Sequence, residues 1–286
     1  MRRFAVMVVL GAFVSGLCGC TCRIPVSNVK TYDPVTTAIT LYARPMDLRL
    51  SKPSGPAQPN YLVVYATGDG GWWGLGHELF DWISRQGYPV VGFSSKSYLK
   101  NLGHVSETET TTPRRLTRDL QSMIAAAQKT LNLPDDTRII LVGISRGAGL
   151  AVVAAGQPEL RSRLAGVIAM ALTREEEHVV RYRRRRGEPR NGTNGRERVE
   201  IKTYEYLPRL ASVPVSVIQS THDHYLPAEA ARRLFGPDTE LRKFHAVPAR
   251  NHSFRGGCAA LRNELDASLR WIQKLDLMSA LQAPPD

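Results

Sequence analysis

Short apolar runs alternate with amphipathic segments along most of the chain. The run at 61–65 is apolar throughout, as expected of a strand buried on both faces of a sheet. From 75 to 85 the apolar residues recur at helical spacing, and Gly87 follows that segment. A weak alternation at 38–42 predicts an edge strand. The same patterns predict further strands at 89–93, 139–143, 164–172, 213–219 and 241–247, and further helices at 116–131, 146–156, 228–234 and 259–275.

This order of elements predicts an α/β fold. Strands that are separated by helical segments indicate a mostly parallel sheet with helices on both faces. The chain has 286 residues, of which 43% are apolar, and no Pro/Gly/Ser-rich linker divides it. We therefore expect one large domain at 38–286, after a polar tether at 21–37. The composition excludes collagen-like and disordered proteins, and four cysteines are too few for a disulfide-dense secreted module.

The N-terminus has the features of an export signal. Arg2 and Arg3 precede a fourteen-residue apolar run at 4–17, which is short for a membrane span but typical of the centre of a signal peptide. We predict a signal at 1–20 and export to the periplasm. The run ends in Leu17-Cys-Gly-Cys20, which is similar to a bacterial lipobox. Lipid attachment at Cys20, which would make the protein a lipoprotein, and simple secretion both remain open.

The cysteines point to at most one disulfide and to no metal site. After cleavage before Cys20, only Cys22 and Cys258 would remain outside the lipobox, and a bridge between them stays open. No group of Cys and His residues has the spacing of a zinc site, so we predict neither a metal nor a cofactor.

One strongly basic segment interrupts the alternation of strands and helices. The formal net charge is +12, and residues 181–198 alone contain eight basic and two acidic residues. We predict that residues 181–198 form an exposed loop or a poorly ordered segment between two strands, within a basic insertion near 173–207. Because the excess lies in one segment of an exported chain, without base-stacking aromatics, we expect no nucleic-acid partner. An anionic membrane surface is the expected partner, and a solvated loop without any partner is the alternative.

The sequence Gly143-Ile-Ser145-Arg-Gly147 directly follows a buried-strand pattern and opens a helical one. This is the nucleophile elbow of the α/β-hydrolase fold, in which two glycines allow a tight turn that exposes the serine hydroxyl. We therefore predict Ser145 as a nucleophile. A glycine-rich turn with a capping serine is the alternative.

The partners of this serine are predicted from their order along the chain. In this fold a carboxylate and then a histidine follow the nucleophile. Asp223 is the carboxylate in the turn after the strand at 213–219, and His252 lies on the loop after the strand at 241–247. We expect His252 to take the serine proton and Asp223 to orient the histidine ring. His222 and His224 are expected at the surface or the pocket rim, and a structural role is the alternative for His252.

The same chemistry requires two backbone donors for an oxyanion. One is expected to be the N–H of Arg146, which follows the nucleophile. The other is expected in the turn Thr67-Gly-Asp-Gly-Gly71, with Asp69 as the first candidate and Gly70 as the second. We expect the Asp69 side chain to cap this turn rather than to contact substrate.

Several motifs resemble the bacterial virulence-factor family typified by VirJ and AcvB. They are Gly68-Asp-Gly-Gly-Trp72, Gly87-Tyr-Pro-Val-Val-Gly92, Thr112-Pro113, Asp119-Leu120 and Leu141-Val-Gly-Ile-Ser145, within about a third of the chain. The resemblance implies an exported α/β-hydrolase that cleaves the aminoacyl ester of lysyl-phosphatidylglycerol, with Ser145 as nucleophile and Asp223 and His252 as its partners. The chain departs from the family at Arg146, where an aromatic residue is usual, just after Tyr98, and at 173–207.

Three functions follow from these observations. The first is an exported serine esterase that cleaves an aminoacyl-phospholipid through a Ser-His-Asp triad and an acyl-enzyme. The second is a carboxylesterase for small acyl esters with the same triad. The third is a non-catalytic virulence or accessory protein of the envelope with a vestigial triad, against which the intact set of Ser145, Asp223 and His252 argues.

Overall fold

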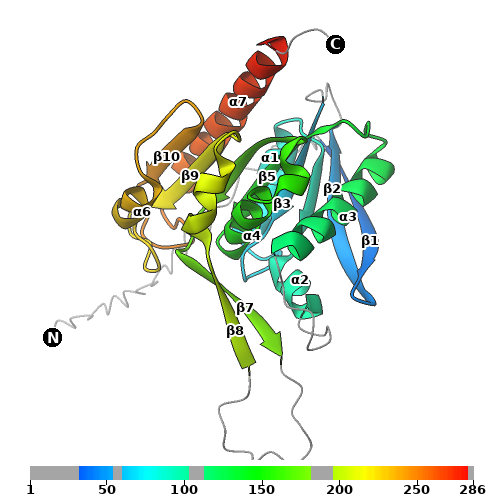
Figure 1. Cartoon of the computed structure of the whole chain (residues 1–286), viewed down its shortest axis with the longest axis horizontal. Coiled ribbons are helices and arrows are strands. Elements are labelled where there is room, and N and C mark those ends of the chain that lie inside the picture. The colour runs from blue at the N-terminus through cyan, green and yellow to red at the C-terminus, as the bar shows by residue number, and fades with distance from the viewer. Residues whose placement is uncertain (1–31, 54–59, 103–112, 182–195, 283–286) are drawn as a thin grey trace, which may run out of the picture.

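The computed structural model describes residues 32–53, 60–102, 113–181 and 196–282. Eight strands form one sheet in the order β1-β2-β4-β3-β5-β6-β9-β10 (Figure 1). The six strands from β4 to β10 in this order are parallel, while β1 and β2 are antiparallel at one edge, which confirms the mostly parallel sheet. The parallel strands are β3 (Tyr61–Ala66), β4 (Val90–Phe93), β5 (Arg138–Ile144), β6 (Leu164–Met170), β9 (Val215–Ser220) and β10 (Arg242–Val247).

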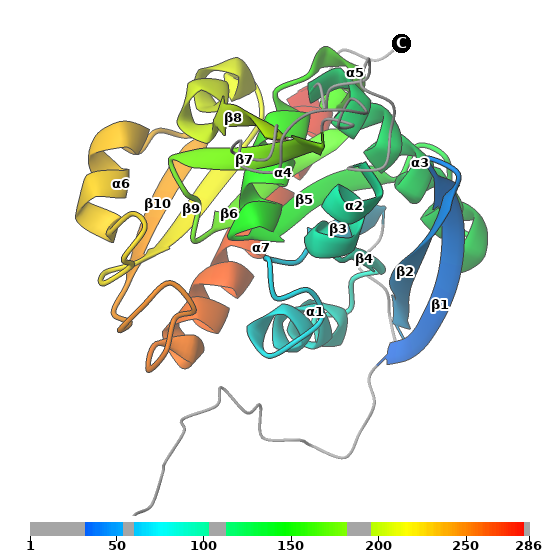
Figure 2. The same cartoon turned by 90° about the horizontal axis from the view of Figure 1, so that it is seen from below.

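Helices cover both faces of the sheet (Figure 2). One layer contains α1 (Leu75–Arg85) and α7 (Cys258–Gln282). Successive residues of β3 point to opposite layers, so that Val64 packs with the larger layer and Val63 with α1 and α7. The larger layer contains α2 (Ser95–Leu102), α3 (Pro113–Leu131), α4 (Arg146–Ala155), α5 (Pro158–Arg161), the 3₁₀ helix η1 (Thr203–Leu210) and α6 (Ala228–Phe235).

The antiparallel edge corrects the expected start of the domain. β1 (Tyr32–Leu41) begins six residues before the expected boundary at 38, and β2 (Arg44–Pro53) was not predicted. The first part of β1 was not predicted because Pro34 is unusual in a strand. An edge strand nevertheless tolerates proline, which has no N–H to donate. In β2, Met46, Leu48 and Leu50 alternate toward the core and are buried. The expected tether at 21–37 therefore ends too late, since residues 32–37 belong to the sheet.

The insertion expected as a loop is in part a β-hairpin. β7 (Glu175–Arg181) pairs antiparallel with β8 (Arg196–Lys202), and the pair projects from the body of the domain (Figure 1). After β8, η1 buries Tyr204, Leu207 and Leu210 in the core. The loop expected at 181–198 was therefore wrong at its ends, because residues 181 and 196–198 pair in this hairpin and strand pairing satisfies their backbone. Residues 182–195 lie outside the described residues.

The expected signal, Cys20 and Cys22 also lie outside the described residues. Cys258 is disulfide-bonded, and its partner cysteine is not among the residues described. In the part of the chain that the structure describes, no helix is both long and apolar enough to cross a membrane.

The pairing between β6 and β9 is short, as are those of β4 with β2 and with β3. Only the residues 167–170 of β6 pair with 215–218 of β9. Helix α7 packs against both strands at this place. The Ser268 hydroxyl of α7 lies 2.7 Å from that of Ser216 in β9, and Ile272 fills the space beside Gly166 of β6.

The turn from β5 into α4 packs its backbone tightly, both against the end of β3 and against itself. A Cβ atom on Gly147 would stand 2.1 Å from the carbonyl oxygen of Ala66, and one on Gly143 would stand 2.1 Å from the carbonyl oxygen of Gly147. Glycine is required at both positions because no side chain fits between these backbones.

We therefore predict that Gly147→Ala lowers the free energy of unfolding by about 3 kcal/mol. This value is at the upper end of the usual cost of overpacking, because the added methyl group would meet a rigid backbone. Urea denaturation followed by circular dichroism measures this change. The matched control is Gly70→Ala, because a Cβ atom on Gly70 meets nothing within 4 Å. The control should change the free energy of unfolding by less than about 0.5 kcal/mol. Equal stability of the two variants would contradict the assigned contact.

Candidate active site

The turn between β5 and α4 presents Ser145 above the carboxyl end of the sheet. Ser145 has φ 54° and ψ −123°, a conformation that is unfavourable for a residue with a side chain. Its N–H donates to the carbonyl of Met170 at 2.8 Å, so β6 holds the strained residue in place. The sharp turn directs the serine hydroxyl away from the sheet, as a nucleophile elbow does.

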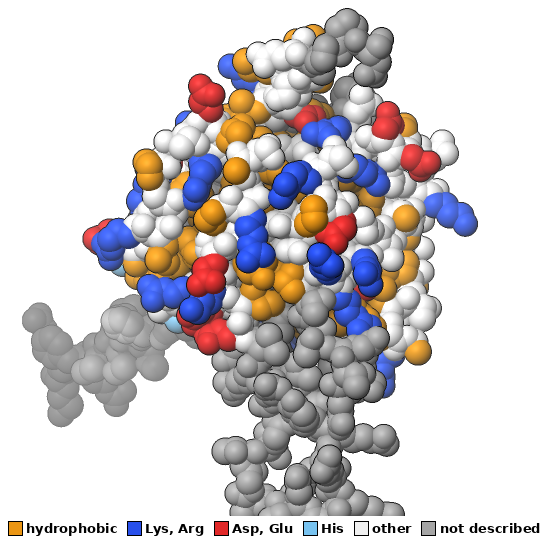
Figure 3. Space-filling view, in the orientation of Figure 1, with side chains coloured by type: hydrophobic (Ala, Val, Ile, Leu, Met, Phe, Trp, Pro, Cys, Tyr) orange, Lys and Arg blue, Asp and Glu red, His pale blue; other side chains and the backbone are white. Residues whose placement is uncertain are grey.

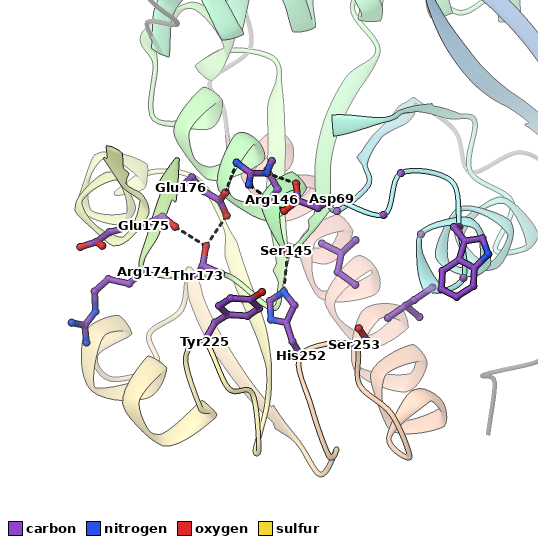
Figure 4. A pocket seen from close by; sticks show the side chains of 18 of the residues that line it. Asp69, Ser145, Arg146, Thr173, Arg174, Glu175, Glu176, Tyr225, His252 and Ser253 are labelled. Carbon is purple, nitrogen blue, oxygen red and sulfur yellow. Dashed lines mark hydrogen bonds and ion pairs between the residues drawn. The ribbon is translucent and has the colours of Figure 1, made fainter. Parts of the chain in front are cut away.

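Three loops bring Ser145, His252 and Asp223 into one hydrogen-bonded chain. The Ser145 hydroxyl lies 2.7 Å from Nε2 of His252, as the dashed line in Figure 4 marks. Nδ1 of the same ring lies 2.7 Å from Oδ2 of Asp223. The three residues follow β5, β10 and β9, and parallel neighbours in a sheet end at the same edge. The structure thus brings together the three residues that their chain order singled out.

The carboxylate of Asp223 is held on both oxygens. The residue is 1% exposed. Oδ1 accepts from the N–H groups of Tyr225 at 2.9 Å and Leu226 at 3.4 Å, and Oδ2 accepts from Nε2 of Gln219 at 3.0 Å. These donors satisfy a buried acceptor and fix the direction in which Oδ2 faces His252.

The two histidines beside Asp223 do not join this chain. His222 and His224 are exposed. Nδ1 of His222 lies 3.1 Å from the carbonyl oxygen of Ala249, while the ring of His224 packs on Tyr225 with centroids 4.1 Å apart. Their surface position agrees with the sequence-based expectation.

A pocket of about 700 Å³ opens over Ser145 and His252. Two aromatic side chains at its border are strongly exposed, with Trp73 at 84% and Tyr225 at 65%. The ring of Tyr225 also stands edge-on to His252, with centroids 4.7 Å apart. Charged residues from the turn at 68–71, from α4 and from the base of the hairpin line the pocket: Asp69, Arg146, Arg174, Glu175, Glu176 and Glu200.

The residues predicted to donate to an oxyanion line this pocket. Gly68 lies directly against Ser145, since a Cβ atom there would stand 3.3 Å from Cβ of Ser145. Asp69 and Gly70 follow Gly68 along the chain, Arg146 follows Ser145, and all three line the pocket. The donor roles of their N–H groups remain predictions.

The expectation that the Asp69 side chain caps its own turn was wrong. Its carboxylate instead accepts hydrogen bonds from Nε and Nη2 of Arg146, the latter at 3.1 Å (Figure 4). The guanidinium reaches this carboxylate from the start of α4, and a bidentate ion pair is stronger than a turn-capping bond.

Glu176, which no sequence motif singled out, lies buried at the base of the hairpin. Its Oε1 accepts from the Thr173 hydroxyl at 2.6 Å, and its Oε2 lies 3.4 Å from Nη1 of Arg146. Burial raises the pKa of Glu176 above the usual glutamate value, with Thr173 and Arg146 opposing the effect. The run Glu175-Glu-Glu177 carries no signal for which glutamate points inward. Among the residues described, no group of three or more His, Cys, Asp or Glu side chains is arranged to hold a metal ion.

Solved structures with the α/β-hydrolase fold resemble this chain. The dienelactone hydrolase from Anabaena variabilis has a TM-score of 0.55 and 15% identity, covering 85% of this chain and 98% of its own. Est1E from Butyrivibrio proteoclasticus has a TM-score of 0.58 and 12% identity, over 83% and 99%. Acylaminoacyl peptidase from Pyrococcus horikoshii has a TM-score of 0.60 and 17% identity, over 86% of this chain but 42% of its own. At these identities the likeness establishes the fold.

None of the curated protein sequences compared with the chain matches it. A sequence model described as "Bacterial virulence protein (VirJ)" matches residues 60–206, just over half of the chain. The match extends well past Ser145, where the quoted motifs end, and includes the base of the hairpin, while Asp223 and His252 lie beyond it. The chain therefore belongs to the VirJ family of bacterial virulence proteins, with the α/β-hydrolase fold.

Proposed function

We propose that this protein is a serine esterase. The observation that carries the proposal is the hydrogen-bonded chain from Ser145 through His252 to Asp223 at the floor of an open pocket. The Ser145 oxygen attacks the ester carbonyl while His252 Nε2 takes its proton, and the imidazolium returns that proton to the departing alcohol. Water then cleaves the acyl-enzyme by the same route. Asp223 holds the ring in the required tautomer and stabilises its charge.

The oxyanion of each tetrahedral intermediate faces the pocket between the turn at 68–71 and the start of α4. The N–H groups of Arg146 and Asp69 stabilise it there, with Gly70 as the second candidate on the turn. Gly68 permits the turn to approach Ser145 closely because it has no side chain.

We further propose an aminoacyl ester of a phospholipid, such as lysyl-phosphatidylglycerol, as the substrate. Four carboxylates and two arginines line the pocket, although the chain as a whole has a net charge of +12. The lining therefore holds two more carboxylates than arginines, with Arg146 paired to Asp69 and Glu176. A lysyl group carries two ammonium ions, so this lining attracts it more than it attracts a neutral acyl chain.

We place this activity in the periplasm, at a membrane surface. The N-terminal pattern supports export, with Cys20 as a site of lipid attachment, and the disulfide of Cys258 fits an oxidising compartment. Exposed Trp73 and Tyr225 at the pocket border suit the boundary between lipid and water. Lysine and arginine side chains are scattered among acidic ones over the domain face in Figure 3, whereas residues 181–198 of the sequence contain eight basic and two acidic residues.

The first test uses the purified protein and its Ser145→Ala variant. We expect a fluorophosphonate probe to label the wild type and not the variant, because the probe reacts with an activated serine. Release of lysine from lysyl-phosphatidylglycerol in mixed micelles should fall by about 10⁴-fold or more in the variant.

Hydrolysis of p-nitrophenyl butyrate by the same preparations separates the candidate functions. Labelling and butyrate hydrolysis without any release of lysine would favour the carboxylesterase for small esters. Absence of both labelling and hydrolysis in the wild type would favour the accessory protein.

The second test separates His252 from its neighbours on the turn of Asp223. His252→Ala should lower kcat by about 10⁵-fold, because the pair of nucleophile and base acts as a unit. Asp223→Asn should lower kcat by about 10⁴-fold, because an amide would hold the His252 ring in the wrong tautomer. The matched control is His222→Ala, which removes an exposed imidazole from the same turn and should leave kcat within about twofold of the wild type. Near-normal hydrolysis by His252→Ala would refute the assigned base.

The third test concerns the basic insertion. Replacement of Arg183, Arg184, Arg185 and Arg186 by Gln should weaken binding to phosphatidylglycerol liposomes, since each basic residue near an anionic surface contributes about 1 kcal/mol. The loss should be larger at low salt, where screening is weak. Hydrolysis of p-nitrophenyl butyrate serves as the control and should not change. Equal sedimentation of both proteins with liposomes at low ionic strength would leave the insertion as a solvated segment without a lipid partner.

A further inference from the structure

We propose that the Arg146 side chain is a positioning residue that ties the turn at 68–71 to the base of the β7–β8 hairpin and thereby sets the oxyanion site beside Ser145. The inference rests on the proposed esterase function and assigns a role to a side chain that the triad chemistry does not use.

The guanidinium of Arg146 joins two carboxylates from distant parts of the chain. Nε and Nη2 donate to the two oxygens of Asp69, and Nη1 lies 3.4 Å from Oε2 of Glu176 (Figure 4). Asp69 belongs to the turn after β3, and Glu176 is the second residue of β7. A planar guanidinium suits this geometry because its donors point in fixed directions toward both partners.

The Glu176 end of this bridge is rigid. The side chain of Glu176 is 6% exposed, and the Thr173 hydroxyl holds its other oxygen at 2.6 Å. Its Cγ packs on α4 so closely that a Cβ atom on Gly149 would stand 2.4 Å away. A buried carboxylate is costly without a cationic partner, so the pairing with Arg146 is required for the hairpin base to lie here.

The Asp69 end of the bridge is the flexible one. The Asp69 side chain is 64% exposed, and its turn is rich in glycine. An exposed ion pair contributes little to global stability. Its effect is local, because it restricts the turn that supplies one oxyanion donor.

The two residues joined by the bridge are also the two predicted backbone donors. The side chains of Arg146 and Asp69 pair with each other, which restricts the movement of one backbone segment relative to the other. Donors that are already in position stabilise the developing charge without reorganisation. The guanidinium itself is occupied by carboxylates, which argues against a direct role in binding a substrate phosphate.

The test is the steady-state kinetics of Arg146→Gln, Arg146→Lys and Asp69→Asn in the full chain with p-nitrophenyl butyrate. We expect Arg146→Gln to lower kcat about 10- to 100-fold, since displacement of a reacting geometry by about 1 Å can cost 10²-fold. KM should stay within about threefold, because a bridge that sets transition-state donors does not alter ground-state binding. Arg146→Lys should recover part of kcat, because lysine keeps the positive charge but lacks the planar set of donors of a guanidinium.

The matched control is Arg138→Gln. Arg138 opens the same strand, β5, and its Nη2 lies 2.5 Å from Oδ1 of Asp276 at the opposite end of the sheet. Thermal unfolding measures the loss of stability in each variant. Arg138→Gln should lose stability without a change in kcat, which separates a local effect at the site from a general loss of folding.

The outcomes distinguish the two proposals. A wild-type kcat in Arg146→Gln, with Ser145-dependent turnover intact, would overturn the positioning role alone. An equal fall of kcat in Arg138→Gln would also overturn it, since the effect would then follow stability. Absence of Ser145-dependent turnover in the wild type would overturn the esterase function and this inference with it.

Discussion

The close contact of Gly147 with the end of β3 is the constraint on which the site depends. Because the carbonyl of Ala66 occupies the place of a side chain, α4 begins directly above the sheet rather than beside it. This position forces Ser145 into its unfavourable backbone conformation and directs its hydroxyl into the pocket. It also brings the start of α4 next to the turn at 68–71, so one packing contact positions both Ser145 and the turn beside it.

The parts of the fold that sequence could predict are those with a single physical requirement. Strands such as β3 and β5 are buried on both faces, so their residues are apolar apart from Arg138, which opens β5. Helix α1 has its bounds as predicted because its apolar stripe and Gly87 mark it clearly. The first part of β1, the whole of β2 and the hairpin were missed because prolines and charges are tolerated where one side of a strand faces solvent. Helix α2 was missed for a related reason, since its short polar sequence buries mainly Tyr98 and Leu102.

The triad was predictable because its order along the chain follows from the direction of parallel strands. Each of Ser145, Asp223 and His252 lies just after a strand whose end reaches the same edge. The bridge of Arg146 was not predictable from the sequence. Arg146 lies 77 positions from Asp69, and its other partner, Glu176, lies on a strand of the hairpin that was not expected. The exposed aromatic border depends likewise on how two loops meet in space.

The short pairing between β6 and β9, a seam of four residue pairs, affects the order of events in unfolding. Ser145 and the turn at 68–71 belong to the sheet on one side of this seam, whereas Asp223 and His252 follow the two strands on the other. Four residue pairs, the packing of α7 and the packing of η1 on α4 hold the halves together. Opening of this seam separates His252 from Ser145 while each half keeps its own buried contacts. Partial opening of this kind needs less free energy than global unfolding, so the hydrogen-bonded chain of Ser145, His252 and Asp223 is lost more easily than the fold that carries it.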